Sequence, residues 1–144
     1  MRIQAENAVS ASPTYGLKSV VLKLASASRP APCEEASFVA NAMIEEVARR
    51  SGLPFTIVRP TMYLDNLLKP SARTEIVQQR VFAPPIAESQ RIAWTSTDDC
   101  ARAAVTLLER GIDAGDHRIA GPESVGGGEL AARIGAGHGA AGAA

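Results

Sequence analysis

Hydrophobic and polar residues follow two different periods along this chain, and residues 34–59 show both of them clearly. Apolar residues recur at helical spacing through 34–50, which predicts an amphipathic helix. Gly52 is well placed to end that helix in a left-handed conformation. Residues 55–59 are a short β-branched run, typical of a parallel strand buried on both faces. The apolar stripe of the helix comprises Ala36, Val39, Ala40, Met43, Ile44 and Val47.

A second apolar run, residues 19–24, precedes the helix and predicts another strand. The Ser-, Ala- and Pro-rich residues 25–32 predict a loop after it. Two strands joined by a helix of this length form a right-handed βαβ crossover, in which the strands are parallel. The predicted fold class is therefore α/β, with a partial parallel sheet, flanking helices and a small C-terminal α/β cap.

The remaining elements are shorter or less regular. Residues 62–79 predict one helix that is interrupted at Pro70, and the glycine- and alanine-rich residues 135–144 predict a disordered tail. Two prolines restrict residues 81–86 to an edge strand at most. We also expect helices at 2–11, 96–110 and 129–134, and short strands at 91–94 and 117–120.

Composition narrows the classes of partner and compartment. The chain of 144 residues has 15 basic and 15 acidic residues, so no basic excess attracts nucleic acid or an anionic membrane. Its two cysteines, Cys33 and Cys100, are far apart. That spacing argues against a disulfide framework and favours a reducing cytoplasm. No apolar run approaches the roughly 20 residues that span a bilayer.

Three patterns that could carry chemistry have simpler explanations. Gly137, Gly139 and Gly142 spell GxGxxG, but the pattern follows a predicted helix rather than a strand, so we interpret it as coincidence. The two histidines, one of them His117, lack further ligands at metal spacing, so no metal site is expected. Asp98 and the acidic residue after it are typical of a helix N-terminus.

Polar residues follow both strands of the predicted crossover. Ser26 follows the first strand, and Thr61, Met62 and Tyr63 follow the second. Because parallel strands end at one edge of a sheet, these residues could face a single crevice, where open α/β sheets bind ligands. Ser37 and Asn41 share one face of the long helix. That face is either exposed to solvent or a polar strip that borders the crevice.

Four segments in this order resemble the NmrA-like branch of the atypical short-chain dehydrogenase/reductases. They read SVVLKLAS, AMIEEVARRSGLPFTIVRPTMYLDNLL, RIAWTSTDDCARAAVTLLERG and HRIAGPESVGGGELAARI. The resemblance covers residues 5–134 and implies a Rossmann-type, NAD(P)-binding fold. It implies that residues 1–61 are the C-terminal part of a dinucleotide-binding domain and that 62–134 form a substrate cap. The family's glycine-rich phosphate loop precedes the part present here, so we expect a C-terminal half.

The resemblance also implies roles for single residues. The superfamily's catalytic Ser falls on Ala25 or Ser26, its Tyr on Ser37 and its Lys on Asn41. Serine is a poor proton donor, and an uncharged Asn cannot depress a neighbour's pKa, so ordinary dehydrogenase chemistry is not expected from these positions. By resemblance, Pro60 and the three residues after it border the nicotinamide end of a cofactor.

The function that the resemblance implies is NAD or NADP binding, coupled to reduction of a small carbonyl or quinone substrate in the crevice. Tyr63 is the candidate substitute acid. The alternatives are a non-catalytic redox sensor that binds a protein partner, and an inactive fragment. If strands are missing beside residues 19–24, the exposed sheet edge predicts a homodimer or poor solubility. The alternative partner for this sheet edge is the N-terminal half that the family resemblance implies.

Overall fold

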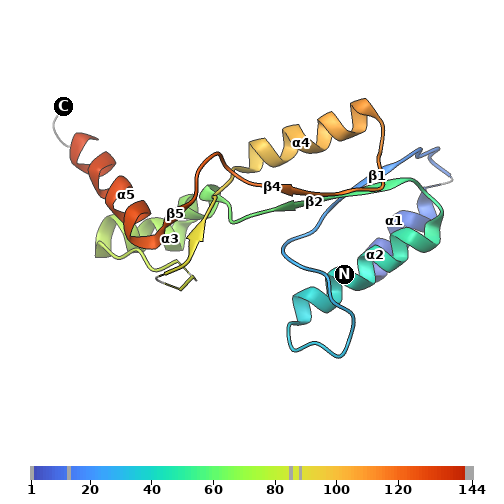
Figure 1. The fold of residues 1–144 in the computed structure, drawn as a ribbon, viewed down its shortest axis with the longest axis horizontal. Coiled ribbons are helices and arrows are strands. Elements are labelled where there is room, and N and C mark those ends of the chain that lie inside the picture. Colours follow the sequence, from blue (N-terminus) through green and yellow to red (C-terminus); the bar gives the residue numbers. More distant parts are fainter. Residues whose placement is uncertain (1, 13, 85, 88, 142–144) are drawn as a thin grey trace. The chain divides into compact units, whose positions relative to one another are not determined.

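The computed structural model describes residues 2–12, 14–84, 86–87 and 89–141. The chain divides into two compact units (Figure 1). The first comprises the residues up to Pro60 together with Asp98–Ile119, and the second comprises Thr61–Thr97 and the residues from Ala120 onward. The sequence predicted one boundary near residue 61, whereas the chain crosses back into the first unit at Asp98.

The first unit is built on a three-stranded sheet in the order β1-β2-β4. The strands are β1 (Val20–Lys23), β2 (Phe55–Pro60) and β4 (Asp116–Ile119). Both pairs are parallel, which confirms the predicted βαβ crossover. In the central strand β2, Thr56, Ile57 and Val58 are all buried, as expected of a strand covered on both faces.

Helices cover both faces of this sheet. In Figure 1, helix α4 (Thr97–Arg110) lies above the strands, and α2 (Ala36–Ser51) lies below them with α1 (Arg2–Ala11) beside it. Gly52 ends α2 at φ 70°, in the left-handed region that glycine adopts without strain, as predicted.

The face that α2 buries differs from the predicted apolar stripe. Its buried residues are Asn41, Glu45 and Ala48, whereas Met43 is 44% exposed. The prediction was wrong here because it ranked residues by hydrophobicity alone. Asn41 and Glu45 have hydrogen-bond partners on the loop after β1 and on β2, and these partners make their burial possible.

The second unit combines short elements around a small core. Its buried residues Trp94, Val125 and Leu130 are packed by Met62, Phe82 and Ile134 among others. Its two-stranded sheet is antiparallel. The elements are a 3₁₀-helix η1 (Leu64–Leu68), α3 (Pro70–Thr74), a π-turn η2 (Glu75–Gln79), β3 (Arg91–Ile92), β5 (Val125–Gly126) and α5 (Gly127–Ala141).

Several sequence-based boundaries change in this unit. The helix predicted over 62–79 consists of three shorter pieces. The last helix begins at Gly127 and continues to Ala141, so residues 135–141 are helical rather than disordered. Gly137 of the GxGxxG pattern lies inside this helix, and Gly142 lies outside the described residues. No strand forms over the described part of 81–86.

Two absences concern the described residues only. No helix among them is both long enough and apolar enough to cross a membrane. Within the same part of the chain, no group of three or more His, Cys, Asp or Glu side chains could hold a metal ion. His117 instead pairs with Asp113 at 2.9 Å.

Candidate functional site

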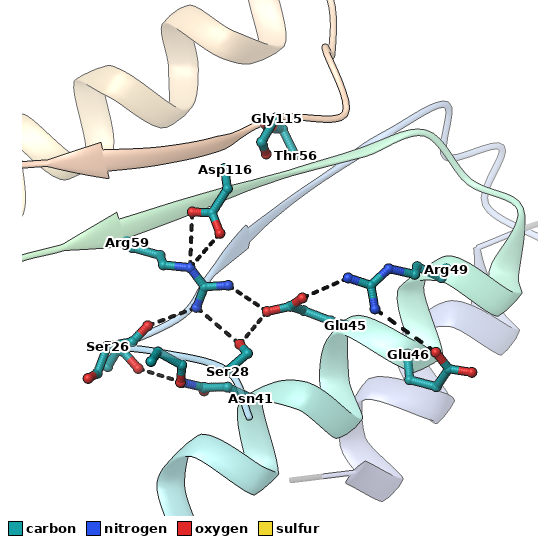
Figure 2. A network of polar contacts seen from close by, with 12 residues as sticks. Ser26, Ser28, Asn41, Glu45, Glu46, Arg49, Thr56, Arg59, Gly115 and Asp116 are labelled. Atoms are coloured by element: carbon teal, nitrogen blue, oxygen red, sulfur yellow. Dashed lines mark hydrogen bonds and ion pairs between the residues drawn. The ribbon is translucent and has the colours of Figure 1, made fainter. Parts of the chain in front are cut away.

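The C-terminal part of β2 carries a largely but not fully buried arginine that joins three elements of the first unit (Figure 2). The Arg59 Nε donates to both carboxylate oxygens of Asp116 on β4, at 3.0 and 2.7 Å. One Nη donates to Glu45 Oε1 on α2 at 2.5 Å. The other donates to the carbonyl oxygen of Ser26 at 2.8 Å and to the hydroxyl of Ser28 at 3.1 Å. We call these five residues the Arg59 network.

Backbone register explains this convergence. Asp116 lies opposite Ile57, two residues before Arg59, so both side chains lie on the same face of the sheet. Glu45 lies on the buried face of α2, and its side chain is 8% exposed, against 12% for Arg59. The buried Glu45 and the partly buried Arg59 are tolerated because each has opposite charges and further hydrogen bonds.

The network sets the protonation state of its members. Burial alone would raise the pKa of Glu45, but hydrogen bonds from Ser28 and Arg59 and the charges of Arg59 and Arg49 outweigh it. The pKa of Glu45 therefore lies below its ordinary value of 4.5. Burial would likewise lower the pKa of Arg59, but hydrogen bonds to Asp116 and Glu45 raise it overall.

This direction predicts acid-dependent stability. Because the pKa of Glu45 is lower in the folded chain than in the unfolded chain, its carboxylate stabilises the fold above 4.5. That contribution disappears as the pH falls through the folded-state pKa. As the pH is lowered from about 6 to about 3, we expect the free energy of unfolding to fall less for Glu45→Gln than for the wild type, as measured by urea unfolding. Parallel pH profiles of the two proteins would contradict this role.

The loop after β1 is held by the same helix. Asn41 Nδ2 donates to the carbonyl oxygens of Ala25 and Ala27, at 2.5 and 3.0 Å. Ser26, between them, has a φ of 64°, an uncommon conformation for a residue with a side chain. Ser37, which the sequence paired with Asn41, is exposed and its hydroxyl donates to Glu35 at 3.5 Å.

The residues after β2 belong to the second unit, where they are tied to a short segment of chain. Thr61 Oγ1 donates to the carbonyl oxygen of Ala93 at 2.5 Å. The Thr95 amide donates to the Met62 carbonyl at 3.0 Å, and Tyr63 forms a β-bridge with Thr95. Pro60 is the last residue of β2 and is buried. These bonds hold the candidate cofactor loop in one conformation.

The structure thus brings together only part of the predicted site. In the first unit, Asn41 bonds the carbonyl groups on either side of Ser26, and in the second unit Thr61, Met62 and Tyr63 are tied to residues 93–95. A single crevice that is shared by both groups stays a prediction.

Sequence reasoning missed the Arg59 network. It assigned no partner to Arg59 or Asp116. The available signal was an arginine inside an apolar strand, since such a charge is rarely buried unless it is paired. A single sequence does not show which carboxylate supplies that pairing.

Comparisons with known proteins give matches at the level of structure. No family model matches the chain, and no curated protein sequence matches it. The NADPH-dependent quinone oxidoreductase of Escherichia coli, solved with NADPH, is 22% identical with a TM-score of 0.75. The nucleoside-diphosphate-sugar epimerase of Staphylococcus aureus is 24% identical with a TM-score of 0.71. In both cases the match covers 94% of this chain and 47% of the other.

A third match is the triphenylmethane reductase of a Citrobacter species, solved with NADP(H). It is 19% identical with a TM-score of 0.68, and the match covers 90% of this chain and 44% of the reductase. This chain therefore spans about half the length of the structures that it resembles. At these identities the likeness concerns the fold, and it shows that the chain has a partial Rossmann-like α/β fold.

Proposed function

We propose that this chain forms the nicotinamide side of an NAD(P)(H) site in an NmrA-like protein that reduces a small carbonyl or quinone substrate. The supporting observation is the fold match over 94% of the chain to a quinone oxidoreductase that was solved with NADPH. The Citrobacter triphenylmethane reductase supports the same cofactor class. Because the chain spans about half of these proteins, the activity of a whole protein is part of the proposal.

The loop from Pro60 to Tyr63 is the part of the chain that suits this role. It leaves β2 at the C-terminal end of the strand, where open α/β sheets bind ligands. The bonds of Thr61 to Ala93 and of Met62 to Thr95 fix its backbone before any ligand arrives. Such preorganisation lowers the entropic cost of binding.

A bound reduced nicotinamide would supply the hydride, and the chain would then have to supply a proton to the substrate oxygen. We assign that proton to the phenol of Tyr63, which belongs to the same loop. Ser37 is unsuited to the task because it is exposed and carries a weakly acidic hydroxyl. The neutral amide of Asn41 is already bonded to two backbone carbonyl groups.

These bonds of Asn41 also favour a second candidate, a dinucleotide sensor without turnover. An amide that is committed to Ala25 and Ala27 neither transfers a proton nor assists an acid. The two candidates differ in one measurement. With NADPH and 1,4-naphthoquinone, the enzyme consumes NADPH, and Tyr63→Phe loses this activity. The sensor binds NADPH without consuming it.

The cofactor assignment is tested with the two halves of the dinucleotide. We expect ligand-observed NMR to detect nicotinamide mononucleotide on this chain and to show no binding of adenosine 2′,5′-bisphosphate. Thr61→Val removes the hydroxyl that ties the loop to Ala93, and we expect it to weaken nicotinamide mononucleotide binding by about two- to tenfold.

Thr106→Val is the matched control. It removes a hydroxyl that also donates to a backbone carbonyl, that of Arg102 on the exposed side of α4. It should leave nicotinamide mononucleotide binding unchanged. Equal weakening by both variants, or binding of the adenosine half alone, would overturn the assignment.

A further inference from the structure

Helix α2 presents an apolar face that the rest of the first unit does not fully cover. The residues that the helix buries are Asn41, Glu45 and Ala48. At 3.6 residues per turn, Met43 lies about 160° around the helix axis from both Asn41 and Glu45, and it is 44% exposed. The other apolar residues of this outer face are half-buried or exposed, and they are Ala36, Val39, Ala40 and Val47. Contiguous exposed apolar residues of this kind mark an interaction surface.

Two open hollows lie along this face. The first has a volume of about 700 Å³ and lies between α1, α2 and the loop after β1, with Val9 and Val47 in its lining. The second has a volume of about 750 Å³ and is lined by α2 and the residues just before it. Val39 and Met43 line both hollows, so they form a ridge between them. Helices pack by placing the ridge of one into the hollow of another.

Charged side chains also line the first hollow, and four of them form ion pairs within α2. Arg49 donates to Glu45 at 2.9 Å, and Arg50 donates to Glu46 at 2.7 Å. The side chains of Arg49 and Arg50 are 57% and 75% exposed, so they lie at the border of the hollow. Glu6 of α1 completes the charged part of this lining. An apolar partner on the ridge therefore need not bury these charged groups.

The two ends of α2 have opposite charge. Glu34 and Glu35 precede the helix and are exposed, whereas Arg49 and Arg50 belong to its last turn. Glu34 lines the second hollow and Arg50 the first, so both lie beside the ridge. Two such helices that run antiparallel about Met43 place the acidic end of each opposite the basic end of the other. A second copy of this chain thus matches the face in shape and in charge, as a two-fold contact requires.

We propose that the chain forms a homodimer in which α2 packs antiparallel against α2 of a second copy, with Met43 of both copies at the two-fold axis. The edge of the sheet is less suited to this contact. Strand β1 ends in the exposed Lys23, and lysine on an edge strand opposes pairing with another chain. The helical contact uses no residue of the loop from Pro60 to Tyr63, so it forms with or without a dinucleotide.

Sedimentation velocity of the full chain over a range of concentrations tests the contact. We expect the wild type to dimerise. Met43→Glu places two like charges together at the two-fold axis, so we expect it to weaken dimerisation at least about hundredfold. The matched control is Val105→Glu, at a residue that is 51% exposed on α4, which covers the other face of the sheet (Figure 1). This control should dimerise like the wild type.

Exchanging the end charges tests the antiparallel direction. Glu34→Arg alone faces Arg50 of the second copy with a like charge, and Arg50→Glu alone does the same to Glu34. We expect each of them to weaken dimerisation about tenfold at low salt. The double variant restores opposite charges at both ends, so it should recover most of the wild-type affinity.

A wild type that stays monomeric at every concentration, or a dimer that Met43→Glu leaves intact, would overturn the proposal. Equal weakening by Val105→Glu, or no recovery in the double variant, would do the same. If Met43→Glu does not fold, as judged by far-UV circular dichroism, the charge exchange decides, because it changes exposed residues only.

Discussion

Replacing Glu45 by alanine is expected to lower the free energy of unfolding by about 3 kcal/mol, which is the lower end of the range for breaking a buried ion pair. The variant leaves Arg59 largely buried, with its side chain 12% exposed and Asp116 as its remaining carboxylate partner. The lower end applies because Asp116 is 49% exposed and still neutralises the guanidinium. Urea unfolding at neutral pH, followed by far-UV circular dichroism, measures the loss.

The adjacent residue provides the matched control. Glu46 lies on the same helix and pairs with Arg50 at 2.7 Å, but its side chain is 50% exposed. We expect Glu46→Ala to change the free energy of unfolding by at most about 0.5 kcal/mol. If the two alanine variants fell within about 0.5 kcal/mol of each other, the Arg59 network would not be a stabilising feature of the first unit.

Replacing Gly121 by alanine is expected to destabilise the second unit by about 3 kcal/mol, the upper end of the usual cost of overpacking. A Cβ at this position would overlap the backbone carbonyl oxygen of Trp94. No side-chain rotation relieves that overlap, because the obstacle is main chain. The same close approach allows the Gly121 amide to donate to the Ala93 carbonyl, so the variant should also displace Trp94.

A second glycine should respond in the opposite direction. Gly135 lies inside α5, is exposed, and has open space where a Cβ would be. Since alanine is the better helix former, Gly135→Ala should stabilise the chain by about 0.5–1 kcal/mol and raise its helical signal. The emission maximum of Trp94 should shift in Gly121→Ala and stay constant in Gly135→Ala. Destabilisation by both variants would mean that α5 ends before Gly135.

The sequence pattern predicted the helices and strands whose formation depends mainly on neighbouring residues. The hydrophobic period and the residue propensities predicted the strand around Val58 and the long helix before it. The end of that helix followed from the ease with which Gly52 adopts a left-handed conformation. The parallel pairing followed as well, because a helical crossover of this length permits little else. Of the candidate site, the loop after β2 was correctly placed at the end of its strand.

Patterns failed where burial depends on a distant partner. Helix α2 buries Asn41 and Glu45 instead of its most apolar residues, because Arg59 and the carbonyl groups of the loop after β1 satisfy them. The strand β5 and the extension of α5 were missed for a related reason. Glycine-rich residues there have weak intrinsic preferences, and packing of Val125 and Leu130 against Trp94 compensates for them.

The sequence by itself determined an α/β chain with a parallel crossover, since hydrophobic period and connection length are properties of the chain read in order. Only the tertiary structure decided which polar groups are buried together, that Arg59 joins β2 to α2 and β4, and that the indole N–H of Trp94 is buried without an acceptor among the described residues. The physical reason is that burying a charge or a donor is favourable or costly according to its partners, and those partners lie tens of residues away along the chain.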